Sequence, residues 1–238
     1  MNIQYNGSNY FGWQMQDNAQ TIQGELETAL LPLGDGNRVK IIGAGRTDTG
    51  VHAFGQVAHF ELDTRLSLKE IRNAINARTK TDIEVNKVEI VDDKFHARFS
   101  AKERYYIYQV YTGKSLLYQN QSWHIPSLDV EKLNTTAAII LGEHDFLSIS
   151  KYNPELDHTM CTVYDSKWTL SDDMITFHVK ANRFLHHMVR YLVGTMIAIN
   201  QEKYTNEEFL HILNNPQRNV RIFKAPPNGL ILKQVSYE

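Results

Sequence analysis

One order of expected elements (strand, helix, strand, strand, helix, strand) occurs twice along this chain, and this repetition constrains the fold most. In the first half, apolar residues at helical spacing predict a helix over about residues 21–33. The capping box Ser67-Leu68-Lys69-Glu70 predicts the start of a second helix. Alternating apolar and polar residues predict strands over residues 2–5, 39–42, 56–62 and 83–91.

The second half repeats this order with one additional helix. The expected strands are residues 104–111, 163–170, 174–180 and 230–235, and the expected helices are about 130–141, 184–200 and, behind the capping box Thr205-Asn206-Glu207-Glu208, up to Leu213. Two split βαβ units of this kind predict an α+β chain with two ferredoxin-like (βαββαβ) halves, residues 1–96 and 97–238. The periodicity alone does not determine how the halves meet.

The composition is that of a chain with a core of its own. Its 238 residues are 42% hydrophobic, which suffices for one large or two small domains. The apolar runs are too short to span a bilayer, and the N-terminus lacks the basic and then apolar pattern of a signal peptide. The lone Cys161 cannot build a disulfide framework, which suits a reducing compartment. We therefore expect a cytoplasmic protein.

The sequence offers no metal site that we can recognise. No Cys or His residues have zinc-site spacing. His186 and His187 are consecutive, so on a helix they would face different directions. We expect no metal and no cofactor.

The net charge of −2 gives no indication of nucleic acid binding by itself. A basic surface would require segregation of the 25 Lys and Arg residues. Each local cluster also fits an ordinary solvated face, which is the commoner meaning of such charges. The clusters are Arg98, Lys102 and Arg104; Lys180, Arg183 and Arg190; and Arg218, Arg221 and Lys224.

The stretch that points to chemistry is Gly43-Ala44-Gly45-Arg46-Thr47-Asp48-Thr49-Gly50-Val51-His52-Ala53, between two expected strands. Its glycines permit unusual backbone angles and let a ligand approach the main chain closely. Asp48 is unlikely to be there for packing, so it is the first candidate for a reacting group. The alternative is a purely structural role in an Asx turn, which is the usual role of a loop aspartate.

Spacing removes several other interpretations of this stretch. A P-loop would need Lys and Ser or Thr directly after the last glycine, where Val51 and His52 stand. A dinucleotide fingerprint would need glycine in place of Asp48 and a helix afterwards. Asp48-Thr49-Gly50 matches the aspartic-protease triplet, but that chemistry requires two such carboxylates and no second triplet occurs. A single-copy homodimeric protease stays a remote alternative.

Taken with four other blocks in the same order, the loop resembles the active-site loop of the TruA-type tRNA pseudouridine synthases. The resemblance runs nearly from end to end, and a fainter match, Ala225-Pro226-Pro227-Asn228-Gly229-Leu230, closes it. The four blocks are Tyr5-Asn6-Gly7-Ser8-Asn9-Tyr10-Phe11-Gly12-Trp13-Gln14, Phe95-His96-Ala97-Arg98-Phe99-Ser100-Ala101-Lys102-Glu103-Arg104-Tyr105-Tyr106, Gly142-Glu143-His144-Asp145-Phe146 and Phe184-Leu185-His186-His187-Met188-Val189-Arg190-Tyr191-Leu192-Val193-Gly194.

The resemblance implies a fold, an activity and partners. Members of this family join two halves edge to edge into one continuous antiparallel sheet, with helices on one side and the active-site cleft on the other, and they work as homodimers. They isomerise uridine to pseudouridine in the anticodon arm of tRNA without a cofactor. We expect the same of this chain; the alternative is an RNA-binding protein that keeps the fold without turnover.

The resemblance also assigns roles to individual residues. Asp48 matches the catalytic aspartate, Arg46 the arginine linked to base extrusion, Tyr106 the active-site tyrosine and Arg190 the arginine that pairs with the aspartate. Each of the last three also has a purely structural alternative. These are an ion pair with Asp48 for Arg46, a core position for Tyr106 and a surface helix position for Arg190. His52 either satisfies the loop backbone or contacts RNA.

Three departures limit the match. Thr49 stands where alanine is usual, and the segment at Cys161 lacks an Arg-Thr pair that many members carry. Only four residues precede Tyr5, so the first strand could be abbreviated.

Overall fold

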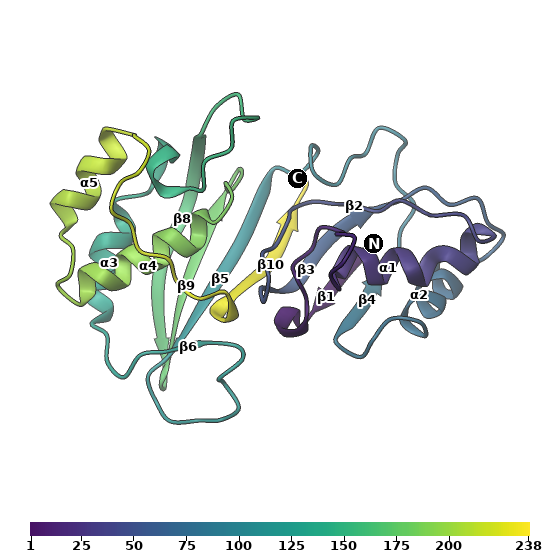
Figure 1. The fold of residues 1–238 in the computed structure, drawn as a ribbon, viewed down its shortest axis with the longest axis horizontal. Coiled ribbons are helices and arrows are strands. Elements are labelled where there is room, and N and C mark those ends of the chain that lie inside the picture. The colour runs from purple at the N-terminus through teal and green to yellow at the C-terminus, as the bar shows by residue number, and fades with distance from the viewer. The chain divides into compact units, whose positions relative to one another are not determined.

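The computed structural model describes residues 1–238 as a mixed α+β chain of five α-helices, ten strands and four 3-10 helices (Figure 1). The residues form two compact units. Unit 1 comprises Met1–Lys102 together with Ile231–Glu238, and unit 2 comprises Glu103–Leu230. The chain therefore leaves unit 1 once and returns to it, whereas we expected a single boundary between residues 96 and 97. That each half is ferredoxin-like stays a prediction.

Unit 1 follows the predicted order of elements. Its strands lie in the order β4-β1-β3, and both β2 and β10 pair with β3. All pairs are antiparallel except β3 with β10, which is parallel. The elements are β1 (Asn2–Tyr5), α1 (Ile22–Leu30), β2 (Ile42–Gly43), β3 (His52–His59), α2 (Leu68–Asn76), β4 (Ile83–Lys87) and, after unit 2, β10 (Leu230–Ser236).

Local signals place both helices of unit 1. The Thr21 side chain accepts a hydrogen bond from the Gly24 amide and starts α1. The predicted capping box of Ser67 and Glu70 is confirmed at the start of α2. The strands differ more, since β2 has only two residues and β3 begins four residues earlier than expected. Its first residue, His52, is polar and yet buried, so simple alternation did not reveal the start of the strand.

Unit 2 has one four-stranded path in the order β5-β9-β8-β7, and β6 pairs in parallel with β5. The strands β6 and β7 were not predicted, because one has two residues and the other carries Glu143, His144 and Asp145. The elements are β5 (Glu103–Tyr111), β6 (Trp123–His124), α3 (Val130–Ala138), β7 (Gly142–Asp145), β8 (Met160–Ser171), β9 (Met174–Ala181), α4 (Met188–Asn200) and α5 (Asn206–Asn214).

Helices α3 and α4 cover one face of the unit 2 sheet (Figure 1). Trp168 lies on this face in β8, and its indole N–H donates to the sulfur of Met196 in α4. Ser166, two residues earlier, donates to the Ala137 carbonyl in α3. Cross-strand pairing puts Tyr108 in the row of Trp168 and Tyr106 in the row of Ser166. Both tyrosines therefore point to the helix-covered face.

The start of α4 differs from its prediction. The helix begins at Met188, not near Phe184, because His187 has a φ of 64° and a left-handed residue cannot continue an α-helix. Most of α4 is buried, which agrees with its mostly apolar sequence. None of the five helices combines the length and the apolar character that a bilayer crossing needs.

Candidate active site

The loop that carries Asp48 connects β2 to β3 and is held by the segment after β1. Within it, Thr47 is buried, and its hydroxyl lies 2.8 Å from the hydroxyl of Tyr5. The Thr47 carbonyl accepts from the Trp13 amide at 3.0 Å, and the Tyr10 carbonyl accepts from the Gly50 amide at 3.3 Å. Burial raises the pKa of Tyr5 to about 12, so this hydroxyl stays protonated. The block from Tyr5 to Gln14 thus positions the loop.

Gly12 shows how closely the two segments approach. A Cβ at this position would lie 2.6 Å from the Thr47 carbonyl oxygen and 3.1 Å from the Asp48 carbonyl carbon. Its φ of 88° is also in the region that favours glycine. Only glycine fits here, and any larger residue would push on the backbone that carries Asp48.

The loop is anchored at both ends. The Ala44 amide donates to the Val57 carbonyl at 2.7 Å, and the Gln56 side-chain amide donates to the Gly45 carbonyl at 2.8 Å. At the other end, Gly50 has a φ of 78° and the Val51 amide donates to the Asp48 carbonyl at 3.1 Å. Backbone groups and the Gln56 side chain therefore close the turn at both ends.

The candidate side chains of this loop differ in exposure. Asp48 is half-buried, whereas Arg46 is exposed. Arg46 forms no ion pair with Asp48, so the alternative in which it only fixes the turn has no support. His52 is buried, and its Nδ1 accepts from the Gly7 amide at 3.0 Å. This is the backbone-satisfying role that we considered for His52.

In unit 2, Tyr106 lies on β5 with 8% of its surface exposed. Its ring meets that of Phe184 edge to face, with centroids 5.2 Å apart. The neighbouring tyrosines have other environments: Tyr108 is buried and donates to the Pro226 carbonyl, and Tyr105 lies 2.7 Å from Nδ1 of His178 on the opposite face. Tyr106 thus lies on the helix-covered face of the unit 2 sheet, and the expected position of the cleft stays a prediction.

Arg190 lies in the first turn of α4 and is half-buried, so it is not a surface helix residue. Its Nε donates to the Ala225 carbonyl at 2.9 Å, and the Ala225 amide donates to the Arg190 carbonyl at 2.9 Å. A Cβ on Gly194 would lie 2.4 Å from the Phe223 carbonyl oxygen, so the chain before Ala225 also packs closely on α4. Two sequence blocks that resemble the family are thus joined here.

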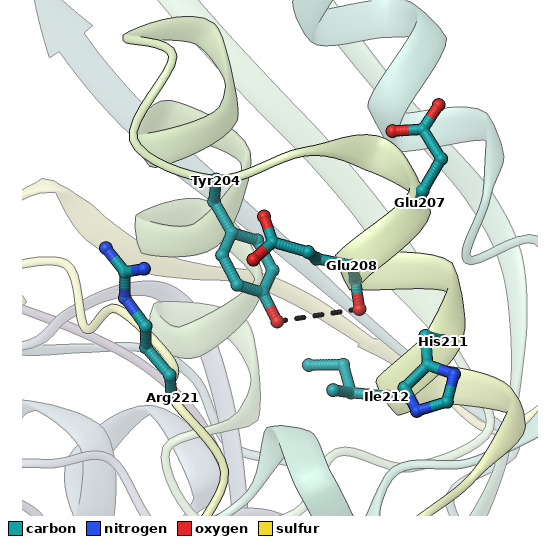
Figure 2. A pocket seen from close by; sticks show the side chains of 6 residues that line it. All are labelled: Tyr204, Glu207, Glu208, His211, Ile212 and Arg221. Atoms are coloured by element: carbon teal, nitrogen blue, oxygen red, sulfur yellow. Dashed lines mark hydrogen bonds between the residues drawn. The ribbon is translucent and has the colours of Figure 1, made fainter.

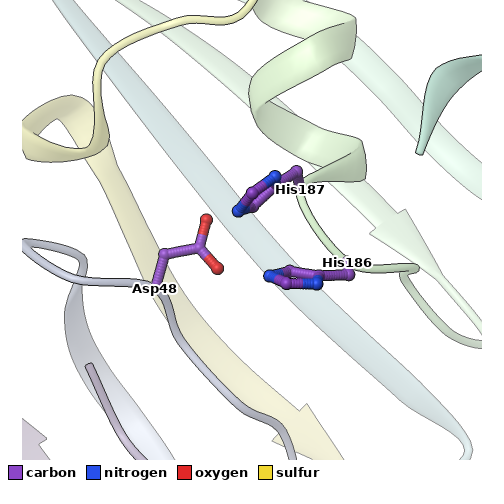
Figure 3. Close-up of side chains that lie close together, drawn as sticks. All are labelled: Asp48, His186 and His187. Carbon is purple, nitrogen blue, oxygen red and sulfur yellow. The ribbon is translucent and has the colours of Figure 1, made fainter. Parts of the chain in front are cut away.

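His186 and His187 precede α4, and Figure 3 draws them with Asp48. Their ring centroids are 4.0 Å apart, and the ring planes are tilted by 53°. The prediction that they face different directions on a helix is wrong, because neither belongs to the helix and the left-handed His187 turns the chain. This argument against a metal therefore fails, and the expectation of no metal depends on the sequence spacing elsewhere.

Cys161 is a core residue of β8. It is 1% exposed, and burial raises the pKa of its thiol to about 12, so it is not a nucleophile at neutral pH. Thr49, the other departure from the family pattern, is exposed.

Comparison with known proteins gives the same assignment as the blocks. The sequence model of a family described as tRNA pseudouridine synthase matches residues 1–100 and 136–238. The chain belongs to the tRNA pseudouridine synthase family. A tRNA pseudouridine synthase A of Geobacillus sp. (strain WCH70) is 36% identical over 239 residues, covering 99% of this chain and 96% of the relative. The enzyme of the same name from Ehrlichia chaffeensis is 39% identical over 241 residues, covering 99% and 98%.

A third relative, the tRNA pseudouridine synthase A of Dictyoglomus thermophilum, is 38% identical over 240 residues, covering 99% of this chain and 97% of the relative. Membership in the pseudouridine synthase family overturns the aspartic-protease alternative. Family membership does not reveal that Tyr5, Tyr10 and Gly12 position the loop. The sequence block that contains them matches the family but does not indicate what each residue contacts. That role became visible from their contacts with the loop.

Proposed function

We propose that this chain is an enzyme that isomerises uridine to pseudouridine in the anticodon arm of tRNA. The observation that carries the proposal is the family membership together with a half-buried aspartate on a loop whose backbone is fixed by other residues. A loop fixed in this way holds the carboxylate in one position. A pure RNA-binding protein would gain nothing from placing it near polyanionic RNA.

The reaction defines what the residues must do. The bond between ribose C1′ and uracil N1 breaks, a bond between C1′ and C5 forms, the C5 proton leaves and N1 gains a proton. No electrons are gained or lost overall, so the balance requires no redox carrier. Asp48 attacks or assists at the sugar carbon, as a carboxylate can. The fixed loop backbone holds it in one position while the uracil rotates.

The remaining residues have proposed roles around the extruded base. The target uridine must leave its stack before Asp48 can reach it, and Arg46, which is exposed on the same loop, supports extrusion. Tyr106 stacks on the uracil, and Arg190 pairs with the reacting carboxylate. The family also supports two ferredoxin-like halves in one continuous sheet, a homodimer and a cytoplasmic location, which we include in the proposal.

The test is Asp48→Asn, with Asp35→Asn as the matched control in another loop of unit 1. We expect Asp48→Asn to form no pseudouridine while its thermal unfolding and tRNA affinity stay near those of the wild type. Asp35 is exposed, so its substitution should leave turnover unchanged. Substantial turnover by folded Asp48→Asn protein contradicts the assigned residue, and a wild type without isomerase activity contradicts the function.

A further inference from the structure

The segment of residues 215–225 carries three exposed cations at every third position: Arg218, Arg221 and Lys224. We call these three residues the basic strip. No Asp or Glu occurs between residues 215 and 225. In a chain with a net charge of −2, an uninterrupted group of cations on one short segment is a local excess of positive charge.

Each cation of the strip lies against an aromatic ring, and Arg218 does so most closely. Its guanidinium carbon is 3.6 Å from the centroid of the Tyr152 ring, a distance typical of direct stacking. A stacked guanidinium has its N–H groups in the plane of the group, so they point past the edge of the ring. Arg218 makes no ion pair with a carboxylate, so these donors are directed to solvent.

Arg221 and Lys224 are held in related ways. The guanidinium carbon of Arg221 lies 5.3 Å from the Phe223 centroid, and one of its N–H groups donates to the Lys203 carbonyl at 3.1 Å. The Lys224 ammonium lies 5.8 Å from the Tyr191 centroid and 2.9 Å from Nδ1 of His187. The rings restrict these long side chains before any ligand arrives, so less entropy is lost on binding.

The backbone of the segment is fixed as well. At its start, the Gln217 amide donates to the Ser148 hydroxyl at 2.9 Å, and that hydroxyl donates to the Gln217 carbonyl at 3.1 Å. At its end, Ala225 is bonded twice to Arg190, and Phe223 packs on Gly194. The cations are therefore presented from an anchored segment.

We propose that the basic strip binds phosphates of the tRNA backbone. The inference rests on the proposed function, which makes tRNA the polyanion this chain must hold. Lys224 lies six positions after Arg218, a span of at most about 20 Å, over which one nucleic acid strand presents about six phosphates. Each cation can thus engage its own phosphate, and the stacked arginines can do so with two donors.

Arg221 of the strip also lines an open pocket of about 540 Å³ (Figure 2). It is lined by Tyr204 and Arg221 and also by the carboxylates of Glu207 and Glu208. Glu208 accepts from the Thr205 amide at 2.8 Å as the capping-box residue of α5. A backbone hydrogen bond lowers the pKa of Glu207, so it stays charged at neutral pH. These two carboxylates would repel a phosphate bound at Arg221. Neutralising one of them should therefore raise the affinity for tRNA, whereas neutralising the strip should lower it.

The first experiment compares two triple variants by tRNA affinity over a range of salt concentrations. One replaces the strip (Arg218→Gln, Arg221→Gln, Lys224→Gln), and the control replaces two arginines and one lysine in unit 1 (Lys69→Gln, Arg72→Gln, Arg78→Gln). We expect the strip variant to reduce the slope of log K against log salt by about 2 to 2.7, since each phosphate contributes roughly 0.7 to 0.9. The KM for tRNA should rise with the Kd, and the control should keep the wild-type slope.

The second experiment removes a negative charge. Glu207→Gln should raise tRNA affinity at low salt, whereas Glu131→Gln, in the first turn of α3, should not. Thermal unfolding verifies that the variants are folded; if the triple variant is not, Arg221→Gln and Lys224→Gln singly should each reduce the slope by about 0.7 to 0.9. An unchanged slope in folded strip variants, or an equal loss in the control, overturns the strip. A wild type that binds tRNA through the strip without isomerising uridine overturns only the proposed function.

Discussion

Replacing Gly12 by alanine should disturb the active-site loop from a distance, because the new Cβ meets the loop backbone. The Cβ would lie 2.6 Å from the Thr47 carbonyl oxygen, and ordinary contact requires a retreat of roughly half an ångström or more. The displaced backbone carries Asp48, one residue further along. Since a misplacement of about 1 Å can cost about 100-fold in rate, we expect Gly12→Ala to lose about 10- to 100-fold in kcat/KM, or about 1.4 to 2.7 kcal/mol.

Gly36→Ala separates this effect from that of backbone strain. Gly36 also has a left-handed φ, 82° against 88° for Gly12, but no atom lies within 4 Å of its Cβ position. Both substitutions should lower the free energy of unfolding by about 1 to 2 kcal/mol from the left-handed backbone. Gly12→Ala should lose a further 1 to 3 kcal/mol or so from overpacking.

The assays are denaturant unfolding and single-turnover pseudouridine formation, at a temperature where both variants are folded. Gly36→Ala should keep near-normal turnover. Equal turnover in the two variants would refute the reasoning that the segment around Gly12 positions Asp48. A loss in Gly12→Ala that merely follows its unfolded fraction would refute it as well.

Three further predictions concern the ring of Tyr106, metal dependence and pH. If Tyr106 stacks on uracil, Tyr106→Phe should keep much of the activity. Tyr106→Leu should lose about 10- to 100-fold in activity, since stacking is worth roughly 1–3 kcal/mol. An equal loss in both variants would indicate that the hydroxyl transfers a proton. Turnover should survive exhaustive chelation once the tRNA is folded, and restoration by one divalent metal would contradict this. Burial and the neighbouring His96 lower the pKa of His59 below 6.5, and its Nδ1 accepts from the Ala97 amide, so the folded state favours neutral His59. The free energy of unfolding should therefore fall as the pH drops below about 6.5, where the unfolded chain binds a proton at His59 more readily than the folded one. His59→Gln should weaken this dependence, and the exposed His124→Gln should not.

The sequence predicted the elements whose signals are local. The capping boxes at Ser67 and Thr205 and the strand before Asn6 lie where expected, because side chain and backbone within a few residues determine them. The start of α4 was wrong since His187 adopts a left-handed conformation that its residue type does not announce. The short strands β6 and β7 were missed because β6 has only two residues and β7 consists mostly of polar ones, so neither shows an apolar alternation.

The candidate site shows the same division. Asp48 could be identified because a loop aspartate among glycines lacks a packing role, and the family match strengthened it. The contacts of Tyr5 with Thr47 and of Arg190 with Ala225 could not be foreseen, because each joins residues more than thirty positions apart. A sequence pattern can indicate that a residue has no role in the core. It cannot indicate which distant segment contacts that residue.

The parallel pairing of β10 with β3 affects how this protein is made. The Ile231 and Leu232 positions pair with His52 and Ala53, immediately after the loop that carries Asp48. A ribosome delivers β10 only after it has synthesised all of unit 2. Until then, the start of β3 at His52 and Ala53 lacks this partner strand, although β2 already pairs with the end of β3, and an open edge can pair with another chain. The nascent protein therefore exposes a pairing edge beside its reactive loop for most of its synthesis, and a stop codon just before β10 would leave that edge open permanently.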